Sequence, residues 1–438
     1  MKNFFKIFIL FIIVISLQSF AQNNKGQSNK ITGTWQGKLK VSGLEIRIVF
    51  NINENEKGNL TATMESPDQT TQKIPVDTVI FNDGNIKLEV KVVDGYFDGN
   101  FNSDSLALTG QWHQHGNSLP LLLKKVDKIK EVKKAQETKQ SIYTKHAKDV
   151  SIVVNGYKLN GTLLVPVSNK PIDVVLIIAG SGPTDRDGNS TMLPGKNNSL
   201  KMLADTLYNH GIASLRYDKR EVGANKKVNE SDLTFDMYVN DAIEWVKFLR
   251  KDNRFSKIII AGHSEGSLVG MIAAQRIKVD KFISLCGAGR PLYSLLEEQL
   301  KNSKLPKELL NKSYAIIDSL NHGSTVKNVD PSLTMLFRPS VQPYLISMFK
   351  YDPVNEISKL SIQILVVEGT TDIQVDVKDA ELLSNANKNA KLVIIKNMNH
   401  ILKDVHTTDR IKNIESYSNP DLPLSKLLCK DIVEFIKQ

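Results

Sequence analysis

The sequence is poor in cysteine, with only Cys286 and Cys429 among 438 residues. Both lie in apolar or amphipathic segments, so we expect two separate buried thiols and no disulfide. Metal-ligand patterns are equally scarce. His113 and His115 share one face of an expected strand, but no third ligand accompanies them, so we read them as surface histidines. We therefore predict neither a metal site nor a bound cofactor.

Long apolar runs are absent after the first segment of the chain. That segment has two early basic residues, Lys2 and Lys6, an apolar run from Ile7 to Leu17, and small residues at Ser19 and Ala21. This order predicts a signal peptide over residues 1–21, with an uncleaved anchor as the alternative. No cysteine follows for lipid attachment. We expect an exported, soluble protein, periplasmic or extracellular, without a stable membrane anchor.

Aromatic residues are few where the positive charge gathers. The formal net charge is +10, and much of the excess lies between Lys124 and Lys148 in a segment almost without aromatic side chains. Nucleic-acid binding usually combines a basic face with stacking groups, so we predict no nucleic-acid partner. Residues 124–147 are better explained as a charged linker.

Two kinds of hydrophobic pattern flank this linker. Residues 31–123 alternate with period two between turn signals, which predicts an antiparallel β-domain of about eight strands, a small barrel or sandwich. Trp35 and Trp112 mark its ends; they are core aromatics or, as the less favoured alternative, sugar-stacking groups. Residues 148–438 alternate strand and helix patterns, which predicts a mainly parallel sheet flanked by helices. After a hairpin, the expected strands are 174–179, 213–217, 258–261, 282–285, 362–367 and 392–395, and the clearest helices are 199–210, 235–249 and 267–276.

One strand in this second region ends in a Gly-His-Ser-Glu-Gly sequence. Ser264 lies between Gly262 and Gly266 and is followed by a buried-helix pattern. Glycines on either side allow the strained turn that exposes a nucleophilic serine at the end of a strand. The pattern predicts that Ser264 is a catalytic nucleophile. We read His263 as a packing residue.

A serine nucleophile needs a base and a carboxylate that orients the base. Loops after two later strands supply Asp372 and His400, in the order Ser, Asp, His along the chain. His406 is a rival for the base but lies further along. Asp376 and Asp379 are rivals for the carboxylate, but they fall where the next helix begins. Glu368, still within the strand end, is read as a structural partner.

Residues from about 150 to the end resemble the α/β-hydrolase superfamily, and are most similar to exported bacterial carboxylesterases with a small N-terminal β-domain. The resemblance rests on the loop at 179–189, the run at 216–220, the serine turn, the segment 287–291, and the loops bearing Asp372 and His400. It implies that Ser264 is the nucleophile, His400 the base and Asp372 the orienting carboxylate. The sequence departs from the family at Glu221, where glycine is usual, so we expect that loop to turn differently.

The acyl-enzyme route also needs two donors for the oxyanion. We expect the backbone N–H groups of Glu265 and Ser181 to supply them, with Gly182 as the alternative to Ser181. The segment Asp185-Arg186-Asp187 beyond that loop either holds substrate or forms a hydrogen-bonded turn.

Residues 290–357 form a predicted helical lid of three or four segments. Most of its apolar side chains pack the lid, but some are candidates for an acyl pocket: Leu295, Ile316, Met335, Leu336, Phe337, Tyr344, Met348 and Phe349.

We therefore predict a serine hydrolase of small to medium carboxylic esters, with a small-molecule ester as its partner. The alternative is a serine aminopeptidase-like peptidase, which would need a lid carboxylate such as Glu297, Glu298 or Asp318. A non-catalytic binding protein is the third and weakest candidate.

Overall fold

The structure is a computed structural model. It describes residues 31–41, 44–56, 58–67, 73–114, 117–126, 146–191, 193, 195–225, 228–303 and 305–438. The chain divides into two compact units, residues 1–136 and 137–438. The predicted signal peptide, residues 1–21, and most of the predicted linker lie outside the described residues. Within the described residues, no helix combines the length and apolar character that crossing a membrane requires.

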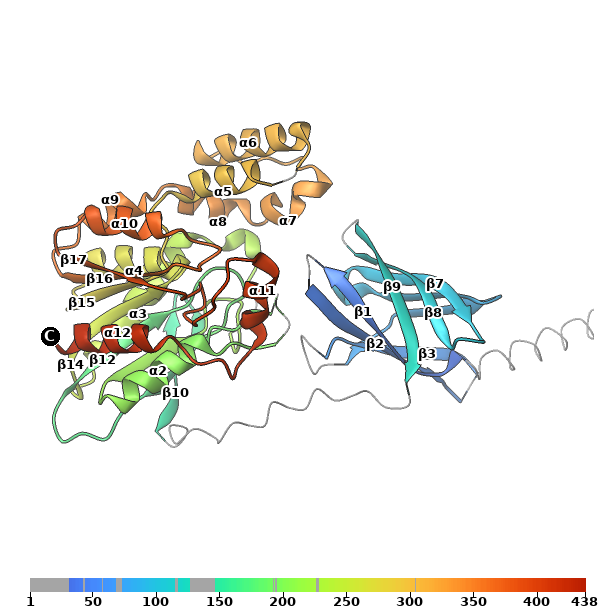
Figure 1. The fold of residues 1–438 in the computed structure, drawn as a ribbon, viewed down its shortest axis with the longest axis horizontal. Coiled ribbons are helices and arrows are strands. Elements are labelled where there is room, and N and C mark those ends of the chain that lie inside the picture. Colours follow the sequence, from blue (N-terminus) through green and yellow to red (C-terminus); the bar gives the residue numbers. More distant parts are fainter. Residues whose placement is uncertain are drawn as a thin grey trace, which may run out of the picture. The chain divides into compact units, whose positions relative to one another are not determined.

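The first unit contains a nine-stranded antiparallel sheet in the order β4-β3-β2-β1-β9-β8-β7-β6-β5 (Figure 1). Its inner face buries one hydrophobic cluster that includes Trp35, Phe50, Phe97 and Trp112. The tryptophans are therefore core residues, because Trp35 is 0% and Trp112 2% exposed. The elements are β1 (Gly33–Val41), β2 (Leu44–Glu54), β3 (Leu60–Glu65), β4 (Ile74–Pro75), β5 (Thr78–Asn82), β6 (Asn85–Val90), η1 (Lys91–Val93), β7 (Gly95–Asn102), β8 (Ala107–Gln114) and β9 (Asn117–Val126).

The second unit contains an eight-stranded sheet in the order β10-β11-β13-β12-β14-β15-β16-β17. The hairpin β10–β11 pairs antiparallel with β13, and all later neighbours pair parallel. Because these strands are parallel, their carboxyl ends meet at one edge of the sheet. The strands are β10 (Ala147–Val154), β11 (Tyr157–Leu164), β12 (Ile172–Ile178), β13 (Ala213–Tyr217), β14 (Phe255–His263), β15 (Lys281–Leu285), β16 (Gln363–Gly369) and β17 (Ala390–Ile395).

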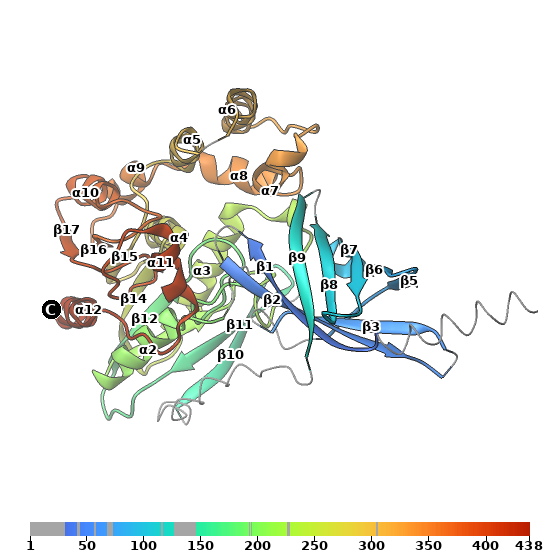
Figure 2. The same cartoon turned by 45° about the vertical axis from the view of Figure 1, so that its right-hand side comes forward.

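Helices cover both faces of this sheet, which is why its central strands are apolar throughout. One hydrophobic cluster joins the sheet to α3 (Phe235–Arg250), α4 (Glu265–Arg276) and α10 (Val377–Asn385). A second cluster joins the opposite face to α2 (Ser199–Asn209) and α12 (Lys426–Lys437). Figure 2 shows the two layers on either side of the strands. Shorter elements are η3 (Glu230–Asp232), α11 (Arg410–Glu415) and η5 (Ser416–Ser418).

The segment between β15 and β16 forms a group of helices with a hydrophobic cluster of its own. Its described residues form five α-helices, one more than the upper expectation: α5 (Leu292–Lys301), α6 (Lys307–Asn321), α7 (Thr334–Phe337), α8 (Gln342–Phe349) and α9 (Pro353–Ser358), with η4 (Pro331–Leu333) before α7. Ile316, Phe337 and Phe349 are buried in this cluster, whereas Met335 is 80% exposed. These side chains therefore pack the inserted helices or face solvent.

Candidate active site

Ser264 lies on a strained turn between β14 and α4. Its φ of 54° and ψ of −121° are rare for a non-glycine residue. A Cβ on Gly262 would meet Gly266 O at 2.1 Å, and one on Gly266 would meet Ile178 O at 2.4 Å. Only glycine therefore fits on either side of the serine, and this crowding holds the turn in its strained form.

Asp372 and His400 meet beside this turn. Asp372 follows β16, and its Oδ2 lies 2.6 Å from His400 Nδ1. Its Oδ1 accepts the backbone N–H groups of Gln374 at 2.7 Å and Val375 at 3.0 Å, which fixes the carboxylate plane. Burial raises the pKa of Asp372, but the nearby His400 and these hydrogen bonds outweigh it, so the pKa is lowered overall. Asp372 is thus an ionised carboxylate suited to orienting a histidine.

His263 connects the serine turn to the loop bearing His400. Its Nε2 donates to the backbone oxygen of His400 at 2.7 Å, and the two rings lie 5.0 Å apart. Burial, and then the neighbouring His400, lower the pKa of His263 to about 4. His263 is therefore a neutral residue that holds the His400 loop, in line with its reading as a packing residue. No hydrogen bond joins Ser264 Oγ to His400 among the described residues; such contacts often form only with substrate bound.

Glu368 and Cys286 lie behind Asp372. The Cys286 sulfur and the carboxylates of Glu368 and Asp372 lie within 4.8 Å of one another. Glu368 is 0% exposed, its Oε1 accepts Gly369 N–H at 2.8 Å, and its Oε2 has no partner among the described residues. Burial, and then the charge of Asp372, raise the pKa of Glu368 well above its ordinary value. Burial also raises the pKa of Cys286, so the thiolate that a metal would require is disfavoured.

The loop after β12 lies against the serine turn. A Cβ on Gly180 would come within 3.1 Å of Ser264 Cβ, so this loop and the turn are in direct contact. Glu265 is the first residue of α4, so its backbone N–H has no acceptor within the helix. The two segments expected to supply oxyanion donors are therefore adjacent.

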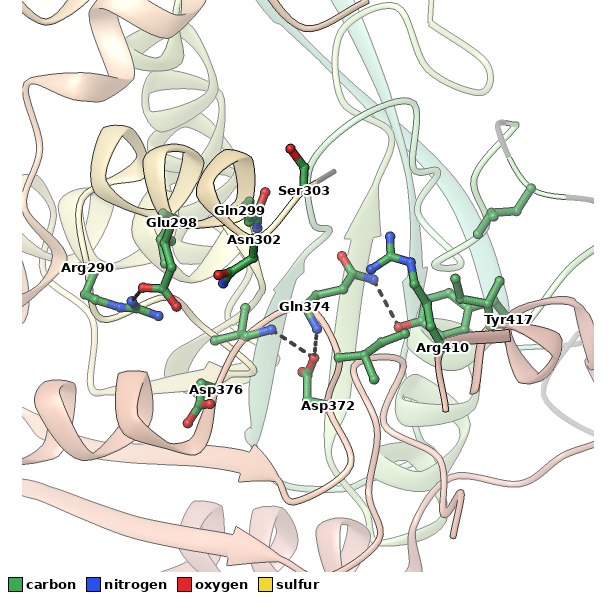
Figure 3. A pocket seen from close by; sticks show the side chains of 15 residues that line it. Arg290, Glu298, Gln299, Asn302, Ser303, Asp372, Gln374, Asp376, Arg410 and Tyr417 are labelled. Atoms are coloured by element: carbon green, nitrogen blue, oxygen red, sulfur yellow. Dashed lines mark hydrogen bonds and ion pairs between the residues drawn. The ribbon is translucent and has the colours of Figure 1, made fainter. Parts of the chain in front are cut away.

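Two cavities lie in this unit near these residues. One, of about 390 Å³, is lined by residues from the loop after β12, from the Lys219–Val222 loop and from the inserted helices, including Gly182, Glu265 and Tyr344. The other, of about 940 Å³, contacts Asp372 and is lined by Leu295, Arg410 and Tyr417 among others. Figure 3 shows Arg290 and Glu298 on one side of this larger cavity and Arg410 and Tyr417 on the other. Of the expected acyl-pocket residues, Leu295 and Tyr344 thus line cavities.

The two rival carboxylates make structural contacts, and the rival histidine is exposed. Asp376 accepts Lys378 N–H at 2.9 Å and caps α10. Asp379 is 0% exposed and bonds Arg290 and the backbone of Gly289. His406 is exposed. These contacts leave Asp372 and His400 as the pair at the serine turn.

The loop at 185–187 forms a hydrogen-bonded turn, one of the two structures that the sequence predicts for it. Asp185 Oδ1 accepts the N–H groups of Asp187 and Asn189 at 2.9 Å each. Asp187 also pairs with the buried Arg216 at 2.9 Å. Glu221, where we expected a different turn, has a φ of 66°, the conformation that glycine adopts easily. The loop therefore keeps a glycine-type turn despite the side chain.

Sequence reasoning missed two features of this site. The carboxylate of Glu265 is buried and lies 3.5 Å from Lys219 Nζ, and that lysine is itself 3% exposed. Lys219 belongs to the run 216–220, which we used only for its similarity to the α/β-hydrolases. The one available signal was a charged run that begins directly after the fully buried strand β13 and includes Lys219, because such a run starts at the active-site edge of the sheet.

Sheet order, flanking helices and the Ser-Asp-His order define the α/β-hydrolase fold in the second unit. The family model described as serine aminopeptidase, S33 matches residues 196–404. The chain is 31% identical over 257 residues to esterase EstD of Thermotoga maritima, a match that covers 57% of this chain and 59% of the length of EstD.

Solved structures of lower identity are also similar. Est1E of Butyrivibrio proteoclasticus, solved with ferulic acid bound, is 21% identical with a TM-score of 0.45, covering 66% of this chain and 98% of that one. The Pyrococcus furiosus esterase Pf2001 is 18% identical with a TM-score of 0.42, covering 66% and 92%.

Proposed function

We propose that this protein is a serine carboxylic-ester hydrolase that acts on small to medium acyl esters. The observation that carries the proposal is the short, buried Asp372–His400 contact beside a strained serine turn. The similarity to esterase EstD supports the same class of reaction. The 390 Å³ cavity next to Glu265 has the size of a small-ligand site and is a suitable acyl pocket.

In the proposed reaction, Ser264 Oγ attacks the ester carbonyl carbon while His400 Nε2 takes its proton. The N–H groups of Ser181 and Glu265 stabilise the oxyanion. The bond to the alcohol oxygen then breaks as His400 returns the proton to that oxygen, leaving an acyl-enzyme. Water attacks the acyl group with His400 again as base, which releases the acid and restores Ser264. Asp372 keeps His400 in the tautomer that can accept from serine.

A serine aminopeptidase-like activity is the second candidate, because the matching family model carries that description. Such an enzyme needs a carboxylate free to bind the substrate ammonium. Glu298 contacts the larger cavity, but it is already paired with Arg290, which also bonds Asp379. That ion pair weakens this candidate relative to the esterase.

The test compares nitrophenyl esters of graded chain length with aminoacyl nitroanilides. Wild-type protein should hydrolyse the esters faster, and Ser264→Ala should abolish turnover. Ser267→Ala is the matched control, because Ser267 is a buried serine on α4, the helix that follows Ser264, and its hydroxyl bonds Ser284. It should keep turnover within about threefold of wild type. Faster nitroanilide cleavage would replace the esterase by the peptidase, and turnover in Ser264→Ala would refute both.

The proposed organisation keeps the predicted boundaries: a β-domain at 31–123, a linker at 124–147, and a hydrolase domain at 148–438 whose lid is 290–357. We also propose that residues 1–21 direct export to the periplasm or the medium. N-terminal sequencing of protein from these fractions should begin at Gln22. A cytoplasmic protein that retains Met1 or Lys2 would contradict this.

A further inference from the structure

A buried lysine lies between the two segments that carry the proposed oxyanion donors. Lys219 follows β13 and is 3% exposed. Its Nζ donates to the backbone oxygen of Gly180 at 2.5 Å and lies 3.5 Å from Glu265 Oε1. It also lies 5.4 Å from the centre of the Tyr238 ring. One ammonium group thus contacts the loop after β12 and the first residue of α4.

The contact with Gly180 acts on a proposed oxyanion donor directly. The Gly180 carbonyl and the Ser181 N–H belong to one peptide group, and in a trans peptide they point in opposite directions. No cis peptide bond occurs among the described residues. Holding the carbonyl toward Lys219 therefore turns the Ser181 N–H away from the lysine. That N–H has no hydrogen-bond acceptor among the described residues, so it is free to bind a ligand.

Packing limits how far this peptide can move. Gly180 sits against Ser264, because a Cβ added to it would lie 3.1 Å from Ser264 Cβ and 3.2 Å from His263 Nδ1. The loop is rich in glycine and would otherwise rotate easily. A charged donor on the carbonyl makes a stronger hydrogen bond than a neutral one and also polarises the peptide. Lys219 is thus placed to fix the direction of the N–H and to strengthen it as a donor.

The burial of Lys219 is costly, which argues against a role in packing alone. Desolvation lowers the pKa of Lys219, and only Glu265 opposes this effect. A buried lysine is stable where its charge is compensated and its N–H groups are bonded. An apolar side chain of the same length would fill the space without that cost.

We propose that Lys219 is a positioning residue that orients the Gly180–Ser181 peptide as an oxyanion donor, with Glu265 as its counter-ion. This inference rests on the proposed function, since it assigns a role within the same acyl-transfer site. Lys219 acts through the peptide and does not touch the reacting atoms. Its effect should therefore appear in transition-state stabilisation and not in substrate binding.

The experiment measures ester kinetics and the rate at which a fluorophosphonate labels Ser264. Labelling displaces fluoride from phosphorus and places a phosphoryl oxygen in the oxyanion site, so it reports on the donors without any ester. The variants are Lys219→Met and Lys219→Gln; the glutamine keeps an uncharged N–H donor. Lys281→Met is the matched control. Lys281 is the first residue of β15, it is 4% exposed, and its Nζ donates to the backbone oxygen of Phe435 at 2.7 Å.

Lys219→Met should lower kcat and the labelling rate by about 10- to 100-fold, somewhat less than loss of a whole donor, with KM within about twofold. Lys219→Gln should fall between Lys219→Met and wild type. Lys281→Met should keep both rates within about twofold. If Lys219→Met does not fold, Lys219→Gln carries the test, and a labelling rate equal to that of wild type overturns the role.

The outcomes separate this inference from the proposed function. Wild-type protein that is labelled at Ser264 but cleaves no ester would refute the esterase, and the labelling rates of the Lys219 variants would still decide the role of Lys219. Rates unchanged in both Lys219 variants, with ester turnover intact in wild type, would refute the role of Lys219 alone. Wild-type protein that is not labelled at Ser264 would overturn both.

Discussion

Replacing Asp372 with asparagine should disable His400 without disturbing the fold. Asp372 Oδ1 accepts two backbone N–H groups, from Gln374 and Val375. The oxygen of an asparagine would keep these two bonds, which turns its NH2 group toward His400 Nδ1. A donor at that position forces the imidazole proton onto Nε2, the atom that must accept the proton of Ser264. The variant would therefore hold the base in the wrong tautomer.

We expect a large loss of kcat because the Asp372–His400 contact is short and buried. The two atoms lie 2.6 Å apart, with exposed side-chain fractions of 5% for His400 and 0% for Asp372. Trapping the wrong tautomer lowers kcat by about 10⁴-fold, which corresponds to about 5 kcal/mol in the activation free energy. Stability should change little, since the asparagine has the same shape and keeps both backbone bonds.

The assay is kcat for a nitrophenyl ester near pH 8, with the unfolding temperature measured in parallel. Asp376→Asn is the matched control, because Asp376 lines the larger cavity of about 940 Å³ that Asp372 also contacts, and its side chain caps α10. It should stay within about threefold of wild type. A kcat for Asp372→Asn within tenfold of wild type would refute the tautomer argument, as would an equal loss in Asp376→Asn.

Three further predictions concern stability. Because the pKa of His263 falls from 6.5 to about 4 on folding, this residue should reduce the stability of wild type as the pH drops through that window; the difference in urea-unfolding free energy between wild type and His263→Gln should shift there by about 3 kcal/mol in favour of the variant. Gly266→Ala should lower the free energy of unfolding by about 3 kcal/mol, since its Cβ would lie 2.4 Å from Ile178 O, whereas Gly156→Ala, with no neighbour within 4 Å, should cost about 1 kcal/mol; equal losses would contradict the crowding argument. The raised pKa of Glu368 favours its protonated form, so the contribution of this residue to stability should fall as the pH rises above the ordinary glutamate value, opposite in sign to that of His263; the difference in thermal unfolding between wild type and Glu368→Gln should shift in favour of the variant between pH 5 and pH 8, and parallel curves would count against a buried protonated acid.

The bounds of several helices and strands were predicted closely from local sequence patterns. The expected strand 213–217 coincides with β13, and the expected helices 199–210 and 235–249 differ from α2 and α3 by one residue at their ends. Continuous apolar runs and amphipathic periods specify such elements without tertiary information. The helix after the serine begins at Glu265, two residues earlier than expected, because the strained turn leads directly into it.

Beyond the Asp372–His400 pair, contacts between side chains of distant segments were not predicted from the sequence. Nothing in a local pattern shows that Lys219 reaches Gly180, or that the carboxylate of Glu265 is buried beside it. The left-handed turn at Glu221 was also missed, because a non-glycine residue at such a position is held there only by its surroundings. These features depend on which loops the sheet order brings together at one edge.

The central claim is that Ser264 carries the acyl group during turnover. Rapid quenching of wild-type protein with a nitrophenyl ester, followed by intact-mass measurement and peptide mapping, tests it most directly. The account predicts a mass increase of one acyl group on the peptide that contains Ser264, and no increase in Ser264→Ala. Ester turnover with the acyl group on another residue, or with no acyl-enzyme under single-turnover conditions, would contradict it.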